Sequence, residues 1–245
     1  MGWNPQAGEH YGKTDRQREA VFAAIENVAA RLAEAKPYLT ELDSAIGDAD
    51  HGSNMDRGFE TVVEKIEEER DSDIDDIIKA VGVALISEVG GAAGPLYGGS
   101  IMHASDQLSE GLTPESTVAF GEAYLEKLTD RGGASVGDKT MVDAVTPAVH
   151  TYKKSIENDD LPAQEALAKA VDAARRGVEF TVPLRANKGR ASYLGWRSVG
   201  HKDPGAASTL LILEAILESA EDSLDESDLE QDATSPTIPD EGKEE

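Results

Sequence analysis

The sequence predicts an all-α fold, namely an up-and-down bundle of eight antiparallel helices. Long segments rich in Ala, Leu and Glu repeat with helical periodicity along the chain. By contrast, no series of short runs with alternating apolar and polar residues is separated by hairpin dipeptides, as a β protein would require. Hydrophobic residues make up 39% of the 245 residues, which is enough to build a core.

Local signals support several of the expected helices. Ser53 precedes the second helix and Asp73 the third, and both residue types cap helix N-termini. Thr113 precedes the fifth helix with Pro114 at its first position, and Pro147 should kink the sixth. The first, fourth, seventh and eighth rest on periodicity. The eight expected helices span residues 14–36, 54–70, 73–89, 95–109, 114–130, 138–157, 162–182 and 205–222.

The two ends of the chain fall outside the expected bundle domain, which spans residues 14–222. Residues 1–13 should fray, as chain ends commonly do. From residue 223 onward the chain is acidic, contains Ser and Pro, and has almost no large apolar residues. Such a segment cannot bury enough apolar surface to fold, so we expect residues 223–245 to form a disordered acidic tail.

The charge of the chain is strongly negative. It contains 48 acidic and 23 basic residues, for a net charge of −25. Residues 221–245 hold 11 acidic residues and one Lys, which leaves 37 acidic and 22 basic residues in the body. This charge argues against broad affinity for nucleic acid or anionic membranes. Because concentrated salt screens repulsion between carboxylates, we hypothesise a halophilic source.

Cysteine is absent, which excludes a disulfide framework, a thiolate zinc site and a cysteine nucleophile. The polar N-terminus lacks the charged and apolar regions of a leader peptide, and no window approaches the roughly 18 apolar residues of a membrane span. We therefore expect a soluble, cytoplasmic protein in which any metal is held by oxygen or imidazole.

The expected connections between helices fall into two kinds. Three are short and polar, whereas four are rich in glycine and in residues capable of chemistry, at residues 43–53, 90–99, 131–139 and 187–205. These four follow the first, third, fifth and seventh helices. In an up-and-down bundle, connections after alternate helices emerge at the same end. The sequence thus predicts one site where four loops converge.

The first of these loops contains three carboxylates within eight residues, on Asp43, Asp48 and Asp50. Gly47 and Gly52 let the chain wrap, so the three acids can aim at one point. Clustered carboxylates repel one another unless a cation lies among them, and oxygen-only ligands select Mg²⁺ or Ca²⁺ over Zn²⁺. The pattern predicts a site for a hard divalent cation.

Two alternatives compete with this interpretation. A calcium-binding EF-hand loop starting at Asp48 fails, because Gly52 and Phe59 stand at its fifth and twelfth positions, where a ligand and a Glu are required. The second alternative is a solvated acidic turn, which a very acidic protein can contain without binding a metal. The sequence alone leaves this alternative open.

The second and third loops have weaker signals. Small residues between Gly90 and Gly99, followed by a helix start, expose backbone N–H groups to an anion. They also permit tight helix packing, and they form neither a Walker-type P-loop nor a dinucleotide fingerprint. Asp138, in the third loop, could simply cap a helix.

The fourth loop is basic within an acidic chain. Tyr193 or Trp196 in this loop could stack on a base or pack in the core. Its basic residues suit phosphate oxygens, with a salt-bridged surface loop as the alternative. They are Lys188, Arg190, Arg197 and Lys202.

Four stretches of the chain resemble, in the right order, the nucleotide-binding L subunit of dihydroxyacetone kinase. They are residues 42–59, 90–98, 137–141 and 189–205. The segments Gly-Asp-Ala-Asp-His-Gly and Gly-Arg-Ala-Ser-Tyr-Leu-Gly are quite specific, and the resemblance covers residues 14–222. It implies an antiparallel barrel of eight helices with a nucleotide at one end.

The resemblance also implies roles for individual residues. Asp43, Asp48 and Asp50 would hold two Mg²⁺ ions that bridge the phosphates of ADP or ATP. Arg190 would contact the phosphates and serve as the catalytic residue. The other nucleotide-binding residues that it implies are His51, Ser53, Asn54, Ala92, Ala93, Gly132, Met141, Asp203, Pro204 and Gly205.

The chain departs from the family pattern at two positions. Ala93 replaces a common Ser, which removes a possible hydroxyl contact. Trp196 stands where a Glu is usual, which bears on the docking of a partner subunit.

The resemblance favours a mode of action in which ADP stays bound to the subunit as a coenzyme. A phosphohistidine protein of the phosphoenolpyruvate-dependent phosphotransferase system would recharge it to ATP. The γ-phosphoryl group would then pass to dihydroxyacetone held covalently on a separate K subunit. The chain ends without a substrate domain, which favours this mode over a fused kinase. A fatty acid kinase nucleotide domain and a nucleotide-sensing regulatory subunit are the alternatives, and the sequence leaves a homodimer open.

Overall fold

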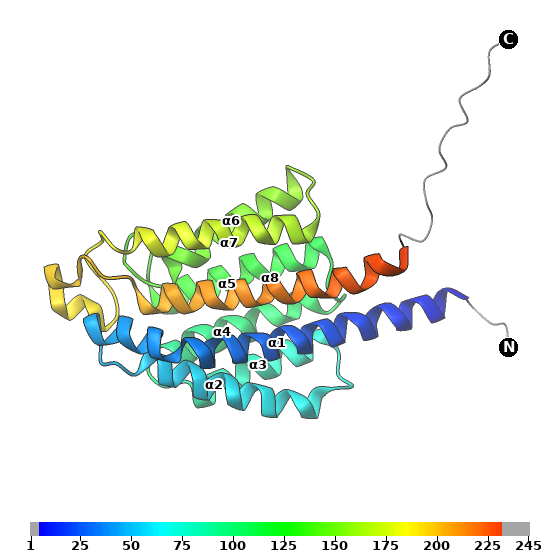
Figure 1. The fold of residues 1–245 in the computed structure, drawn as a ribbon, viewed down its shortest axis with the longest axis horizontal. Helices are drawn as coiled ribbons and strands as arrows, with labels where there is room; N and C mark the ends of the chain where they lie inside the picture. The colour runs from blue at the N-terminus through cyan, green and yellow to red at the C-terminus, as the bar shows by residue number, and fades with distance from the viewer. Residues whose placement is uncertain (1–4, 232–245) are drawn as a thin grey trace, which may run out of the picture.

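A computed structural model describes residues 5–231 of the chain, with side chains described for residues 15–221. Within this part the chain forms eight α-helices and three short 3-10 helices, and it contains no strand (Figure 1). The α-helices are α1 (Pro5–Ile46), α2 (His51–Ile66), α3 (Ile74–Glu88), α4 (Ala93–Ala104), α5 (Pro114–Gly132), α6 (Val142–Glu157), α7 (Ala163–Phe180) and α8 (Pro204–Gln231). The 3-10 helices are η1 (Glu67–Glu69), η2 (Ser105–Leu108) and η3 (Arg190–Ser198).

The eight α-helices form a closed ring. Each helix packs against its neighbours in the sequence, and α8 packs against α1, so the last helix meets the first. The predicted all-α, up-and-down arrangement of eight antiparallel helices is therefore confirmed (Figure 1). Over the described residues, no helix combines the length and the apolar character that crossing a membrane would require.

Apolar side chains fill one continuous core inside the ring. Leu32, Leu85 and Ile66 are fully buried there, and burying each such side chain stabilises the fold by about 2 kcal/mol. Between α6 and α7 small residues are needed instead, because a Cβ atom on Gly177 would lie 2.1 Å from the carbonyl oxygen of Asp143. The backbones of α6 and α7 are therefore in close contact at this point.

Several helix ends differ from the predicted ones. α1 begins at Pro5 rather than at residue 14, and it continues through Pro37 to Ile46 instead of ending at residue 36. Because proline usually ends a helix, the sequence-based prediction placed the end of this helix too early. As a result, Asp43 lies in the last helical turn rather than in a loop. The predicted cap at Ser53 is wrong, because α2 already begins at His51.

Other helix starts agree with their local signals. Asp73 occupies the N-cap position of α3, as predicted, but its side chain makes no capping hydrogen bond. Thr113 caps α5, and its hydroxyl accepts a hydrogen bond from the backbone N–H of Ser116 while the Ser116 hydroxyl accepts one from the N–H of Thr113. This reciprocal capping box satisfies two backbone donors, with Pro114 at the first helical position.

The last helix is longer than expected, because α8 continues past residue 222 to Gln231. Residues 1–4 and 232–245 lie outside the described residues. The expected division into a frayed N-terminus, a domain over residues 14–222 and an acidic tail from residue 223 stays a prediction.

The alternation of helix direction puts four connections at one end of the barrel. They follow α1, α3, α5 and α7 and lie at the left in Figure 1, opposite the start of α1 and the end of α8. The same end therefore holds the N-termini of α2, α4, α6 and α8. These are the four glycine-rich connections that the sequence singled out.

Candidate functional site

The four connections surround a cavity of about 470 Å³. Residues from every one of them line it, so the predicted convergence of the four loops is confirmed. The predicted site residues that line the cavity are Asp43, Asp48, Asp50, His51, Asn54, Ala92, Ala93, Gly132, Met141, Arg190, Asp203, Pro204 and Gly205.

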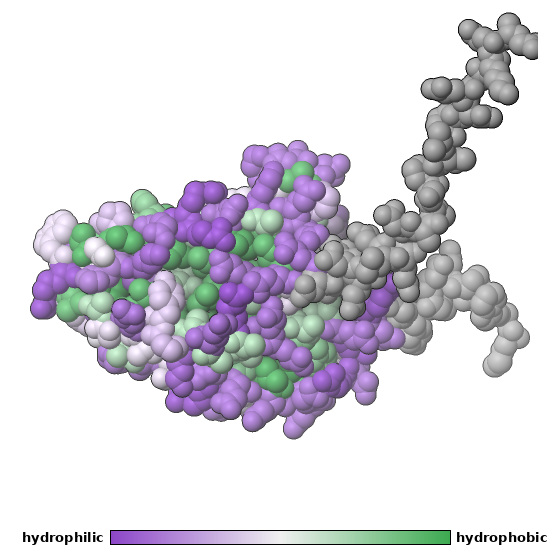
Figure 2. Space-filling view, in the orientation of Figure 1, coloured by the Kyte–Doolittle hydropathy of each residue, from purple (hydrophilic) through white to green (hydrophobic). Residues whose placement is uncertain are grey.

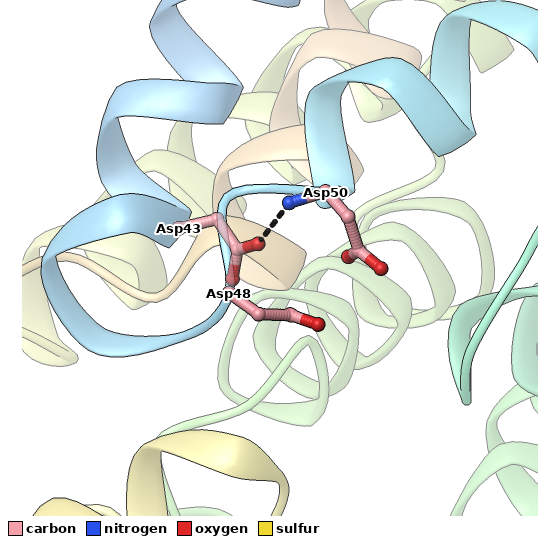
Figure 3. A group of neighbouring side chains, drawn as sticks. All are labelled: Asp43, Asp48 and Asp50. Carbon is pink, nitrogen blue, oxygen red and sulfur yellow. Dashed lines mark hydrogen bonds between the residues drawn. The ribbon is translucent and has the colours of Figure 1, made fainter.

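Three aspartates form a compact cluster at the edge of this cavity (Figure 3). One carboxylate oxygen from each of Asp43, Asp48 and Asp50 lies within 4.8 Å of the others. Asp43 is buried, and its Oδ2 atom accepts hydrogen bonds from the backbone N–H groups of Asp50 at 2.9 Å and His51 at 3.2 Å. Asp48 and Asp50 are exposed to the cavity and extend their side chains toward the same side.

The local backbone explains how a short segment can gather these acids. A Cβ atom on Gly47 would lie 2.0 Å from Oδ1 of Asp43, so a side chain at residue 47 would displace that carboxylate. Ala49 takes a left-handed conformation with φ of +63°, which turns the chain between the second and third acids. The tight turn therefore brings together carboxylates that a continuous helix would separate.

A divalent cation fits the electrostatics of the cluster. Arg190 forms an ion pair with Asp48, with 2.9 Å between the guanidinium nitrogen and the carboxylate oxygen. Among the described residues, neither Asp43 nor Asp50 has an ion-pair partner. Three close carboxylates and one guanidinium leave an excess of negative charge, and oxygen ligands of this kind suit Mg²⁺.

The cavity also suits an anion. The N-termini of α2, α4, α6 and α8 line it, so the positive ends of four helix dipoles point toward it. Arg131 and Lys188 also line the cavity and add positive charge. The cavity therefore offers a cation site and an anion site side by side, as a metal-bound polyphosphate requires.

The buried ammonium group of Lys139 connects the loops around the cavity. This role was not predicted from the sequence. Lys139 is 1% exposed, and its Nζ atom donates hydrogen bonds to the carbonyl oxygens of Thr181, at 2.6 Å, and His201. Burial lowers the pKa of Lys139. These contacts tie the loop before α6 to the long loop before α8.

Asp203 lies at the start of α8 near this lysine. Its Oδ2 atom accepts a hydrogen bond from the backbone N–H of Ala206 at 2.8 Å. Burial raises the pKa of the Asp203 carboxyl to about 7, and the nearby Asp143 carboxylate acts in the same direction, although Lys139 and the hydrogen bond from Ala206 oppose it. The carboxyl is therefore held near its titration point at neutral pH.

A second buried network joins α2, α4 and α8. The hydroxyl of Tyr97 lies 2.9 Å from Oγ of Ser208 and 2.8 Å from Oγ1 of Thr209, and it donates to the carbonyl of Gly205. Burial raises the pKa of Tyr97 to about 12, so the hydroxyl stays protonated. Oγ of Ser208 also lies 2.9 Å from Nε2 of His51. The network fixes the His51 ring at the cavity wall.

Some residues named from the sequence lie elsewhere. Ser53 is exposed and does not line the cavity. Arg197 also lies outside it, and Lys202 pairs with Glu179 at 2.6 Å, as the salt-bridge alternative proposed. The core-packing alternative for the aromatic residues of this loop is wrong, because Tyr193 and Trp196 are 88% and 74% exposed. Neither lines the cavity, and stacking of either ring on a base stays a prediction.

Comparison with known proteins agrees with this geometry. The DAK2 domain family matches residues 45–218. The ADP-binding subunit of the PEP-dependent dihydroxyacetone kinase of Escherichia coli (strain K12) is 43% identical over 187 residues, which cover 76% of this chain and 89% of that subunit. The corresponding subunit of PEP-dependent dihydroxyacetone kinase 1 of Listeria innocua is 40% identical and covers 77% of this chain and 90% of its own length.

A solved structure has a similar fold. The crystal structure of the dihydroxyacetone kinase from C. freundii in complex with AMP-PNP and Mg²⁺ superposes with a TM-score of 0.63 and 26% sequence identity. The alignment covers 81% of this chain and 33% of that one, so the present chain spans about a third of the length of that kinase.

Proposed function

This chain belongs to the DAK2 domain family, and from that premise we propose that it is the nucleotide-binding subunit of a PEP-dependent dihydroxyacetone kinase. The observation that supports this most directly is the cavity. It combines three clustered carboxylates with four convergent helix N-termini. A magnesium nucleotide carries both charges that these groups complement.

The proposed ligand is ADP or ATP with two Mg²⁺ ions. Asp43, Asp48 and Asp50 would hold the metal, which supplies neutralisation of the phosphate charge during transfer. The phosphates would lie against the helix N-termini beside Arg190 and the fixed ring of His51. The base would lie toward the apolar part of the cavity, whose lining residues include Leu96, Leu128, Ala134 and Met141.

The proposed reaction moves the γ-phosphoryl group of ATP to a hydroxyl oxygen of dihydroxyacetone. The bond from the γ-phosphorus to the β–γ bridging oxygen would break and a new bond to the hydroxyl oxygen would form. The hydroxyl proton would pass to a base on the acceptor side or to water, and ADP would remain in the cavity. Such transfer depends mainly on positioning and charge neutralisation. Among the described residues, Arg190 is the one basic side chain that forms an ion pair with the aspartate cluster, and this supports a role for it in stabilising the moving charge.

The proposed function requires two partner proteins. A K subunit would hold dihydroxyacetone, and a phosphohistidine protein of the phosphotransferase system would recharge ADP in the cytoplasm. Identity supports this mode, since the chain is 43% identical to the E. coli ADP-binding subunit and 31% identical to the L-erythrulose 1-kinase of Mycolicibacterium smegmatis.

Two measurements test the function. Mass spectrometry of the purified protein under native conditions should detect bound ADP. In an assay with the K subunit, dihydroxyacetone and the phosphodonor proteins, D48N should abolish transfer while the far-ultraviolet circular dichroism stays helical. The matched control is E60Q, an exposed acid on α2 outside the cavity, which should retain activity.

Retained activity in D48N would refute the role of Asp48. Transfer to fatty acids rather than to dihydroxyacetone would replace the proposed substrate. A chain that binds ADP but transfers no phosphoryl group, and that captures a transcription factor in a nucleotide-dependent way, would be a regulator.

A further inference from the structure

Two aromatic side chains beside the cavity are displayed to solvent. Tyr193 and Trp196 are 88% and 74% exposed, more than any other large hydrophobic residue whose side chain is described. Both belong to η3, which stands at the left extremity of the barrel in Figure 1. Arg190 and Ala191 of the same short helix line the cavity. The two rings therefore border the mouth of the cavity from outside.

The display of these rings follows from how η3 is anchored. Leu194 and Ala191 face inward and pack against Ile46, at the end of α1, and Ala186. Oγ of Ser198, the last residue of η3, accepts a hydrogen bond from the backbone N–H of Ala186 at 2.9 Å, inside a buried setting. Gly195, with φ of +58° and ψ of −126°, kinks η3 between these two anchored parts, and the two aromatic rings on either side of the kink stay exposed. The rings thus stand on a preorganised support.

The segment around these rings differs in charge from the rest of the molecule. Residues 182–202 contain no Asp or Glu, in a chain whose net charge is −25. The Arg185 guanidinium lies 5.4 Å from the ring centroid of Trp196, in a cation–π contact. Within the described part of the chain, Arg185, Lys188 and Arg197 form no ion pair with a carboxylate, whereas Lys202 and Arg190 do. We define Arg185, Lys188, Tyr193, Trp196 and Arg197 as the basic aromatic rim.

The composition of the rim is typical of a protein interface. Trp, Tyr and Arg are enriched among binding hot spots, and Trp and Tyr bury large areas at a low cost in side-chain entropy. Figure 2 shows that pale and green residues gather over the left part of the molecule, whereas purple, hydrophilic residues dominate the right part and the lower edge. Single apolar residues scattered over a surface are normal. A cluster of aromatic and cationic groups at a cavity mouth indicates a binding surface instead.

We propose that the basic aromatic rim is the docking surface for the phosphoryl-accepting K subunit, and that the docked face is acidic with an apolar recess for Trp196. This inference rests on the proposed function. Transfer requires the acceptor oxygen to approach within about 3–3.5 Å of the phosphorus, so the acceptor subunit has to seat around the cavity mouth.

Charge complementarity selects the acidic face. With a net charge of −25 the chain as a whole repels an acidic protein, whereas residues 182–202 contain no Asp or Glu. An acidic face is therefore attracted to the rim and oriented by the net repulsion from the rest of the chain. Tyr193 and Trp196 are uncharged, so the rim presents cationic and apolar groups and no negative charge. An acidic face with an apolar recess complements both kinds of group.

The test uses the full chain loaded with ATP, without phosphodonor proteins, so that each chain transfers once, and titrates the dihydroxyacetone-loaded K subunit from the same genome. The K-subunit concentration that gives the half-maximal single-turnover rate is taken as its KM. W196A should raise the KM for the K subunit about tenfold, which matches a hot-spot loss of about 1.4 kcal/mol. W196E should raise it further, because a carboxylate would face the acidic partner. Neither variant should change the affinity for ADP, since Trp196 lies outside the cavity.

The matched control is V83A, which truncates another exposed apolar side chain, 48% exposed and located on α3. It should leave the KM unchanged. An unchanged KM in both Trp196 variants would overturn the proposal while leaving the proposed function intact. A KM for W196E at or below that of W196A would overturn the acidic face. In a second titration, of the phosphodonor protein against the ADP-loaded chain, a rise seen only there would assign the rim to that protein instead. Absence of transfer by the unmodified chain would overturn the proposed function itself.

Discussion

Gly47 sets the position of the first acidic ligand. The space where its Cβ atom would stand is occupied by Oδ1 of Asp43, at 2.0 Å. That carboxylate also accepts the backbone N–H groups of Asp50 and His51, so its orientation holds the turn together. A single methyl group at residue 47 would thus disturb the cluster without removing any acid.

We predict that G47A weakens Mg²⁺-dependent ADP binding by about tenfold, since outer contacts of metal ligands commonly contribute 10- to 100-fold in affinity. Calorimetric titration of ADP at a series of Mg²⁺ concentrations measures this. G121A is the control, because a Cβ atom there would meet only Val149, at an ordinary 3.6 Å. Equal affinity in G47A and the unmodified protein would show that the turn tolerates the methyl group.

Asp203 should make stability depend on pH. Its pKa is raised from the usual 3.8 to about 7, so between these values the folded state keeps a proton that the unfolded state has lost. Its contribution to the free energy of unfolding is therefore fully present below about pH 4 and is lost as the pH rises through 7.

We predict that D203N flattens this part of the pH profile. Urea unfolding of both proteins between pH 5 and pH 8 measures it, and the difference between the two profiles isolates Asp203 from other titrating groups such as His51. Parallel profiles would show that Asp203 ionises normally in the fold.

Sequence and structure agree at the residue scale where the determinants are local. Asp43, Asp48 and Asp50 lie within eight residues, so their clustering could be read from spacing and glycine content. The role of Lys139 could not be read in this way. Its acceptors are the backbone carbonyls of Thr181 and His201, which are remote in sequence and belong to residue types that give no sign of this contact.

At the scale of single helices, the capping box of α5 is a local determinant that can be tested far from the site. Thr113 and Ser116 satisfy each other's backbone N–H groups, and the connection that contains Thr113 follows an even-numbered helix. It therefore lies at the barrel end opposite the cavity.

We predict that T113A lowers the free energy of unfolding by about 1 kcal/mol, because one capping hydrogen bond is lost. Urea unfolding followed by circular dichroism measures this loss, and the affinity for ADP should be unchanged. A change in ADP affinity would indicate that α5 transmits strain along the barrel.

The existence of all eight helices could be predicted, but several of their ends could not. Periodicity reports that a segment buries one face, and that signal is strong over long segments. The end of α1 depends instead on packing that keeps Pro37 inside the helix against its intrinsic tendency. Because α1 continues to Ile46, Asp43 is held by a helix rather than by a flexible loop.

At the scale of the whole molecule, the dominant property is negative charge. With a net charge of −25, the folded state experiences self-repulsion that salt reduces. The halophilic source hypothesised from the sequence stays a prediction.

We predict that the free energy of unfolding rises with KCl concentration, from dilute buffer to the molar range. Urea unfolding at fixed pH and increasing KCl measures it. A free energy of unfolding that increases on going to low salt would contradict the hypothesis.

The closed ring has a consequence for engineering. α1 packs against α8, and the start of α1 and the end of α8 both lie at the barrel end opposite the cavity. A short linker between these ends would allow circular permutation, with new termini opened in the polar connection after α2, α4 or α6. An affinity tag or a fluorescent domain fused at the same end would leave the cavity mouth open to a second protein.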